Sequence, residues 1–309
     1  MTDAVVRVEG LRKVYRGGFE ALRGVDFEIR RGETFALLGP NGAGKSTTIE
    51  ILEGYRDRTA GAVSVLGVDP AHGGAAWKSR LGIVLQDTGE APTATVREML
   101  AHFAGFYPNP RSIDEVIEAV GLGAKAKTSV RKLSGGQRRR VDVALGIVGS
   151  PELLFLDEPT TGFDPEARRQ FWDLIRGLQD EGTTIILTTH YLDEAAALAE
   201  RAAIIVAGRV AALGRIDELG GADARVPVVR WRDGGRLREE RTDRPGQFVA
   251  GLVAAAGDAE PDDLEVVRPA LEDIYLSFIR ADEAGPSPRA AGAEPVVDPA
   301  TPAAEGVSA

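Results

Sequence analysis

The sequence predicts an α/β fold organised around a phosphate-binding loop, and three observations support this prediction. Residues 39–47 read Gly-Pro-Asn-Gly-Ala-Gly-Lys-Ser-Thr, which fits the spacing G-x-x-x-x-G-K-[ST]. An apolar strand candidate at 34–38 precedes this stretch, and a segment with helical spacing at 46–52 follows it. Two further apolar runs, 153–156 and 183–189, are each followed by polar residues at the carboxyl end of a predicted strand, where α/β sheets place ligand-binding groups.

Composition narrows the class of protein. The chain has 309 residues, enough for one large domain and a smaller unit. Its 47 acidic and 37 basic residues give a net charge of −10, which argues against DNA or RNA as a partner. The absence of cysteine excludes disulfides and cysteine-ligated metals. Residues 1–11 lack the apolar core of a signal peptide, and no run approaches the roughly 20 apolar residues that span a bilayer, so we expect a cytoplasmic chain without a membrane span.

Hydrophobic periodicity predicts the other elements in chain order. They are antiparallel strands within 5–30, strands at 61–68 and 81–85, mostly helix over 92–150, a strand pair at 204–208 and 210–213, strands at 226–231 and 237–242, and helices at 247–256 and 273–279. This order divides the chain into a nucleotide-binding domain at 1–220, with a helical part at about 87–150, and a small α+β appendage at 221–283. Residues 284–309 are rich in Ala, Pro and Gly and are expected to be disordered.

The phosphate loop supplies the first candidate site. Its glycines allow successive backbone N–H groups to point inward, while Lys45 adds a cation and Ser46 offers a hydroxyl to Mg²⁺. A glycine-rich turn without a ligand is the alternative. The strand before the loop and the helix after it favour a nucleotide site, because a helix N-terminus attracts anions.

Polar residues at strand ends supply the catalytic candidates. Asp157 can hold Mg²⁺, and Glu158 can polarise a water for in-line attack on the terminal phosphate. His190 can donate to the γ-phosphate, and Gln86 ends another predicted strand. The alternatives are solvated acids after a strand and a histidine at the surface or at the start of a helix.

Two further stretches each have a functional and a structural interpretation. Tyr15 precedes the loop and can stack its ring on a purine base, or it can be an ordinary packed aromatic of a strand. A hydroxyl and two glycines stand before a predicted helix, where they can bind an anion or simply cap the helix. The residues of this second stretch are Leu133, Ser134, Gly135, Gly136 and Gln137.

Together these motifs resemble the ATP-binding subunit of an ABC transporter, over roughly residues 4–220. The resemblance implies a P-loop ABC cassette, with a mixed central sheet, an antiparallel β subdomain and a helical subdomain. Residues 39–47 are similar to the Walker A loop, 133–137 to the ABC signature, and 153–157 to the Walker B strand. Residues 188–195 and 268–276 resemble the export-type branch, the ABC-2 systems that include drug and antibiotic self-resistance pumps.

The resemblance assigns a role to each candidate residue. ATP is expected to contact Tyr15, Gly39, Pro40, Asn41, Gly42, Ala43, Gly44, Lys45, Ser46 and Thr47. Catalysis is expected from Glu158 as base, His190 as switch histidine and Gln86 of the Q-loop, and Mg²⁺ is expected at Ser46, Gln86 and Asp157. Asp164 is similar to the aspartate of the D-loop, although Phe163 stands where leucine is commoner.

The resemblance also implies partners. One phosphate loop and one signature per chain imply a homodimer with ATP sandwiched between protomers, and a separate ABC-2 type permease meets the helical region after Gln86. The chain is then expected in the cytoplasm, held at the inner face of the cell membrane by the permease, which exports a drug-like, antibiotic or lipid-like substrate. A soluble ABC ATPase acting on nucleic acid or ribosomes is the alternative, but the chain lacks a long coiled-coil insertion and a basic stripe. A binding-only module without turnover is opposed by the intact Glu158 and His190.

Overall fold

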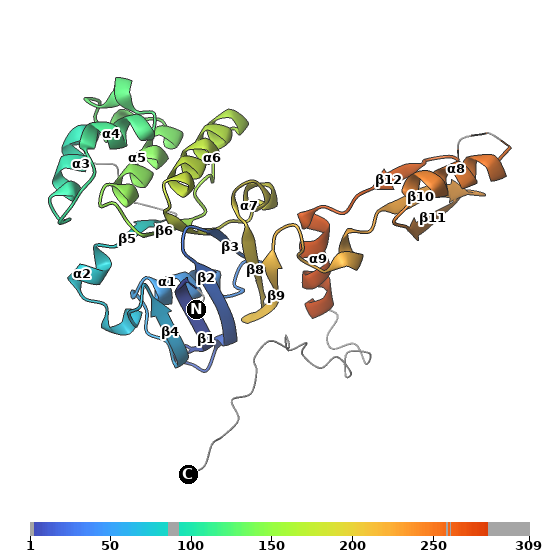
Figure 1. Cartoon of the computed structure of the whole chain (residues 1–309), viewed down its shortest axis with the longest axis horizontal. Helices are drawn as coiled ribbons and strands as arrows, with labels where there is room; N and C mark the ends of the chain where they lie inside the picture. Colours follow the sequence, from blue (N-terminus) through green and yellow to red (C-terminus); the bar gives the residue numbers. More distant parts are fainter. Residues whose placement is uncertain (1–2, 86–92, 258, 260, 284–309) are drawn as a thin grey trace, which may run out of the picture.

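The computed structural model describes residues 3–85, 93–257, 259 and 261–283 (Figure 1). Within these residues the strands form three sheets, and the largest has the order β5-β6-β7-β3-β8-β9. Its first five strands run parallel and β9 is antiparallel to β8. The strands are β3 (Thr34–Leu38), β5 (Leu81–Val84), β6 (Leu153–Asp157), β7 (Thr184–Thr188), β8 (Arg201–Val206) and β9 (Arg209–Arg215). The mixed central sheet predicted from the sequence is therefore confirmed.

An antiparallel sheet of order β2-β1-β4 covers one side of the large sheet. Its strands are β1 (Ala4–Val14), β2 (Glu20–Arg30) and β4 (Ala60–Val65). Helix α1 (Lys45–Leu52) contributes Ile49 and Leu52 to the shared core, in which the rings of Phe27 and Phe35 stack with centroids 5.5 Å apart. The short helix α2 (Ala75–Lys78) adds Trp77, whose indole N–H donates to the Val65 carbonyl at 2.8 Å.

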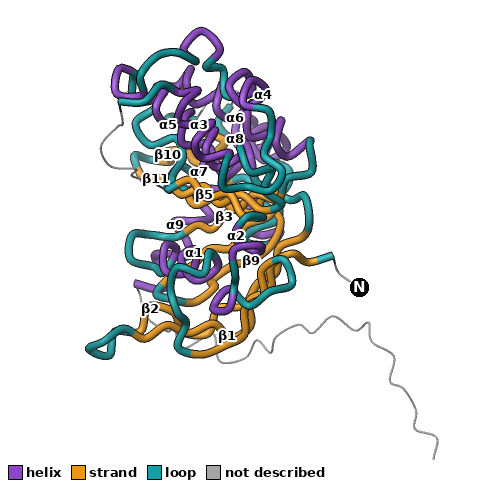
Figure 2. Tube along the Cα trace, turned by 90° about the vertical axis from the view of Figure 1, so that its left-hand side faces the viewer, coloured by secondary structure: helices purple, strands orange, loops and turns teal. Residues whose placement is uncertain are grey.

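A helical layer covers the other face of the large sheet, because alternate strand residues point to opposite faces. Leu154 and Leu187 belong to this second core, together with Leu100 and Phe171 of the helices. The layer consists of α3 (Val96–Ala104), α4 (Ile113–Ala119), α5 (Gly135–Ile147) and α6 (Pro165–Asp180), with 3₁₀ turns at Gly123–Lys125 and Val130–Lys132. In Figure 1 and Figure 2 these helices gather at the opposite end of the molecule from β1 and β2.

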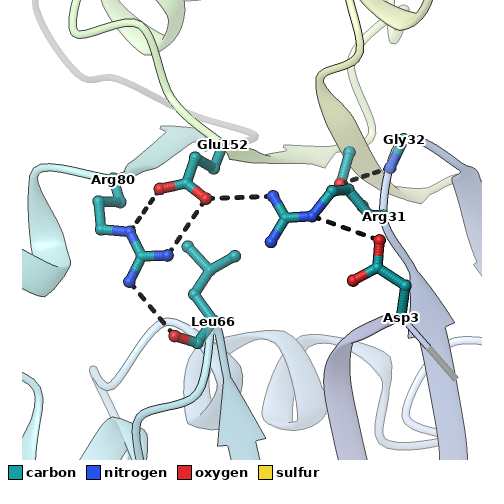
Figure 3. A network of polar contacts seen from close by, with 7 residues as sticks. Asp3, Arg31, Gly32, Leu66, Arg80 and Glu152 are labelled. Atoms are coloured by element: carbon teal, nitrogen blue, oxygen red, sulfur yellow. Dashed lines mark hydrogen bonds and ion pairs between the residues drawn. The ribbon is translucent and has the colours of Figure 1, made fainter. Parts of the chain in front are cut away.

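An ion-pair network ties the antiparallel sheet to the start of β6 (Figure 3). Glu152 accepts from Arg80 Nε at 2.5 Å and from Arg31 Nη1 at 3.2 Å, and Arg31 Nε lies 3.6 Å from Asp3. Arg80 also donates to the Leu66 carbonyl at 3.2 Å. Since Glu152 precedes β6 and Asp157 ends it, the network lies at the edge of the sheet away from the strand-end acids and braces the two sheets there.

The last part of the chain makes a small sheet of order β11-β10-β12 that projects from the body (Figure 1). It consists of β10 (Val228–Asp233), β11 (Arg236–Arg241) and β12 (Glu265–Val267), and Trp231 contacts Phe248 of α8 (Pro245–Ala255). From its place in the sequence, the helix predicted at 273–279 is expected to belong to this appendage. Instead, α9 (Leu271–Glu283) returns to the body, where its apolar residues Leu271 and Ile274 join α7 (Leu192–Leu198) in a core over β8.

Among the described residues, no helix combines the length and apolar character needed to cross a membrane.

Candidate nucleotide site

The phosphate loop lies between β3 and α1, and its backbone depends on glycine. Gly44 caps α1 with a φ of 111°, and a Cβ built there would lie 2.6 Å from Leu22 Cδ2. A Cβ on Gly39 would lie 2.2 Å from the Ile205 carbonyl oxygen of β8. The neighbouring strands therefore leave room for backbone only, which is what a loop needs if its N–H groups are to approach a phosphate.

The ammonium group of Lys45 lies inside the phosphate loop, close to the loop backbone. Its side chain is buried, and Nζ donates to the carbonyls of Gly39 at 2.7 Å and Pro40 at 3.2 Å. Burial lowers the pKa of Lys45, while the negative charges of Glu158 and Asp157 oppose that shift. The ammonium is thus fixed close to the loop backbone, where it can meet the phosphates.

One cleft of about 720 Å³ brings together most of the residues predicted to bind ATP. It is lined by Tyr15, Phe19, Ala21, Asn41, Gly42, Gly44, Lys45, Ser46, Thr47, Asp157, Glu158 and His190. The cleft has aromatic rings from the turn between β1 and β2, loop backbone in the middle and acids at the strand ends, so its chemistry suits a base, a polyphosphate and a catalytic group. Gln86, predicted as a further member of the site, lies outside the described residues.

Thr188 organises the two acids at the end of β6. Its hydroxyl donates to Asp157 Oδ1, and its Oγ1 and carbonyl oxygen accept from the Glu158 N–H at 3.2 and 3.0 Å. Glu158 has a φ of 45°, a left-handed conformation that is uncommon for a residue with a side chain. Such conformations often occur at functional sites, and this one follows the strand end directly.

His190 and Glu158 form a pair at the edge of the cleft. His190 Nδ1 lies 3.3 Å from Glu158 Oε2, and the histidine side chain is 44% exposed while that of the glutamate is 15% exposed. Tyr191 packs on the imidazole with ring centroids 4.0 Å apart. A shielded carboxylate beside a solvent-facing imidazole can orient a water between protein and phosphate.

Tyr15 is half-buried and lies close to positively charged side chains. Its hydroxyl is 3.0 Å from Thr47 Oγ1, and the Arg56 guanidinium lies 5.1 Å from its ring centroid. Phe19, which is not among the predicted site residues, is 62% exposed and stacks on Tyr15 with a centroid distance of 6.4 Å. Its position after Gly17 and Gly18, at the tip between β1 and β2, is the signal that could have revealed it.

The signature residues line a different cleft, of about 390 Å³. Ser134, Gly136 and Gln137 face Phe163 and Asp164 there, and among the residues that the structure describes none lines both this cleft and the one at the phosphate loop. Ser134 is also the N-cap of α5: its Oγ accepts from the Gln137 N–H at 3.3 Å, and its own N–H donates to Gln137 Oε1 at 3.2 Å.

The cleft at the phosphate loop suits Mg²⁺ only when a bound nucleotide supplies further oxygen ligands. The described residues contain no group of three His, Cys, Asp or Glu side chains that could hold a metal ion. Ser46 and Asp157 nevertheless line the same cleft. Mg²⁺ commonly binds through one or two carboxylates plus substrate phosphates, so this sparse set of oxygen ligands suits it.

Comparisons with known proteins identify the family that the chain resembles. A profile of the ABC transporter family matches residues 22–161. The chain is 36% identical over 311 residues to the daunorubicin resistance ATP-binding protein DrrA3 of Streptomyces coeruleorubidus, covering 91% of this chain and 98% of that relative. It is 41% identical over 221 residues to the Nod factor export ATP-binding protein I of Ralstonia nicotianae, covering 70% and 68%.

The fold is also similar to a solved structure. The cbiO1 protein of Clostridium perfringens, part of the ABC transporter complex cbiONQ, superposes with a TM-score of 0.64 at 31% identity. The match covers 69% of this chain and 89% of that protein. With its phosphate loop, strand-end acids and cassette fold, the chain belongs to the ABC transporter family, as an ATP-hydrolysing subunit that powers a separate permease.

Proposed function

We propose that the chain hydrolyses ATP in the cleft of the phosphate loop, as half of a homodimer that drives export through an ABC-2 type permease. The observation that carries the proposal is the Glu158–His190 pair, 3.3 Å apart, on the same cleft as Lys45 and Ser46. A site that only bound nucleotide would not need a shielded carboxylate beside an imidazole at the phosphate end.

In this proposal Glu158 accepts the proton of the attacking water, and His190 donates a hydrogen bond to the γ-phosphate. Lys45 meets the charge of the β- and γ-phosphates, and loop N–H groups bind the remaining oxygens. Ser46 and Asp157 would hold Mg²⁺, which screens phosphate charge. The base of ATP stacks near Tyr15, where Phe19 offers a second exposed ring.

The homodimer is inferred from the separation of the two clefts. Because none of the described residues lines both clefts, we infer that a single chain does not bring Ser134 to the ATP held by its own Lys45. Two copies facing one another can pair each phosphate loop with the partner's signature. The relatives that carry resistance and export names support a drug-like, antibiotic or lipid-like cargo. In this proposal the chain lies at the cytoplasmic face of the membrane, where it binds its permease.

The test is Glu158→Gln, which keeps the shape of the side chain and removes the base. We expect phosphate release to fall by about 100-fold or more, and the variant to dimerise in saturating Mg-ATP and dissociate without it. A variant that turned over like the wild type would contradict the role of Glu158. A monomer with confirmed nucleotide binding, at protein concentrations of tens of micromolar, would contradict the sandwich dimer.

A further inference from the structure

Arg139 places a buried guanidinium between the signature helix and the catalytic strand end. It lies in the second turn of α5, two residues after Gln137, and is 8% exposed. Nothing in the proposed chemistry uses it, since it lines neither cleft. Its position in a run of three arginines gives no sign that one of them points inward.

All three guanidinium nitrogens of Arg139 donate to backbone carbonyls of other segments. Nη2 donates to Asp157 at 2.7 Å and Nε to Pro159 at 2.9 Å. These two residues flank Glu158 in the sequence. Nη1 donates to the carbonyl of Leu85, directly after β5. One side chain therefore joins α5, the end of β5 and both sides of the catalytic glutamate.

The cost of burying this cation argues for a role beyond packing. Burial lowers the pKa of Arg139, while the negative charges of Asp142, Asp157 and Glu194 oppose that shift. The nearest of these carboxylates, Asp142, forms an ion pair with Arg139 at 3.9 Å, too long for a hydrogen bond. A buried charge is a poor way to stabilise a fold, because apolar side chains of similar volume usually serve as well or better. A planar guanidinium, however, fixes three acceptors at once, which neither lysine nor an apolar residue can do.

We propose that Arg139 is a positioning residue for hydrolysis, which holds the peptide groups on both sides of Glu158 and so aims the carboxylate at the attacking water. This inference rests on the proposed role of Glu158 as base. Glu158 needs such support because its left-handed backbone is not one that it would favour by itself. Through Arg139, helix α5, which begins at the signature residues, thereby helps to set the position of Glu158 in its own chain.

The first experiment separates kcat from KM for ATP. In Arg139→Gln we expect kcat to fall about 10- to 100-fold while KM changes less than about 3-fold, because the phosphate loop is untouched. The matched control is Arg176→Gln, which removes an exposed guanidinium from α6 and should stay within about 2-fold of the wild type. A raised KM with unchanged kcat would overturn the proposal.

The second experiment asks whether Arg139 acts through Glu158. In the Glu158→Gln background, measured by single turnover, Arg139→Gln should lower the residual rate by less than about 2-fold, because the group that it positions is gone. An equal loss in both backgrounds would show a general structural effect and overturn the proposal. If Glu158→Gln itself kept wild-type turnover, the proposed function would fail and this inference with it, an outcome distinct from the others.

Folding is checked by ADP binding and by the melting temperature. Should Arg139→Gln not fold, Arg139→Lys decides, since lysine keeps the charge but cannot reach three carbonyls. We expect kcat in Arg139→Lys to fall at least about 5-fold, with near-normal ADP binding. Wild-type turnover in that variant would overturn the proposal.

Discussion

Glu53 makes the stability of this protein depend on pH in a way that one substitution can remove. It follows α1 and is 9% exposed. Burial raises the pKa of Glu53 from 4.5 to about 8, and the negative charges of Asp157 and Glu50 add to the shift. Between these two pKa values the folded protein holds a proton that the unfolded chain has released, so the free energy of unfolding falls as pH rises through this window.

The size of the effect follows from the two pKa values. At pH 7 Glu53 is still protonated in the folded protein, and the unfolded chain gains about 3 kcal/mol by releasing the proton. At pH 5 the corresponding gain is about 1 kcal/mol. Glu53→Gln removes the titration, so we expect it to raise the melting temperature by roughly 6–12 °C at pH 7 and roughly 2–4 °C at pH 5.

The assay is thermal unfolding across pH 5–8 without nucleotide or Mg²⁺, so that ligand binding does not shift the curves. Glu9→Gln, which neutralises an exposed acid on β1, is the control and should change little at any pH. If Glu53→Gln changed the melting temperature equally at pH 5 and pH 7, or lowered it at pH 7, the carboxyl would not be held protonated as described.

Three further outcomes are expected. Gly44→Ala should lower the free energy of unfolding by about 2–5 kcal/mol in urea, because its Cβ would clash at 2.6 Å, whereas Gly42→Ala, with open space around it, should cost only about 1 kcal/mol; equal costs would contradict the argument. Thr188→Val should lower kcat about 10-fold in a phosphate-release assay, with a smaller change in KM, since Asp157 loses its donor; an unchanged kcat would count against that contact. The variants Lys45→Ala and Ser134→Arg are each expected to be inactive alone, but a mixture of the two should regain partial ATPase activity, because one composite site of the mixed dimer is intact. If cross-linking demonstrates mixed dimers and the mixture shows no ATPase activity, the result would contradict a dimer whose two sites act separately.

The sequence was most informative where a local pattern decides the structure. The loop at 39–47 demands glycine, so β3, the loop and α1 follow from spacing alone. Apolar runs located β6 and β7, but not their order, because β3 lies between β7 and β8 through contacts far apart in the chain. Helix α6 is absent from the predicted elements, because its few buried residues stand among charged ones.

The site was predicted as a set of residue types, not as an arrangement. The contact between Thr188 and Asp157 joins residues 31 positions apart, and no local signal reveals it. The inward turn of Arg139 likewise depends on carbonyls directly after β5 and at or just after the end of β6. Ser134 shows a different limit: capping a helix and binding an anion both use the unpaired N–H groups of its first turn, so the same pattern predicts both.

Helix α9 makes the small sheet an insertion rather than a terminal extension. After β9 the chain stays against the body as far as Leu219 and Ala224, then builds β10 to β12 with α8, and returns so that Leu271 and Ile274 cover the large sheet. A chain cut at residue 220 would lose this cover and expose the apolar surface of β8 to water. A deletion of the small sheet that joins residue 226 to residue 270 through a short glycine linker would keep the cover that α9 provides over β8. Two chain segments therefore connect the small sheet to the body, and they restrict its movement relative to the body more than a single connection would.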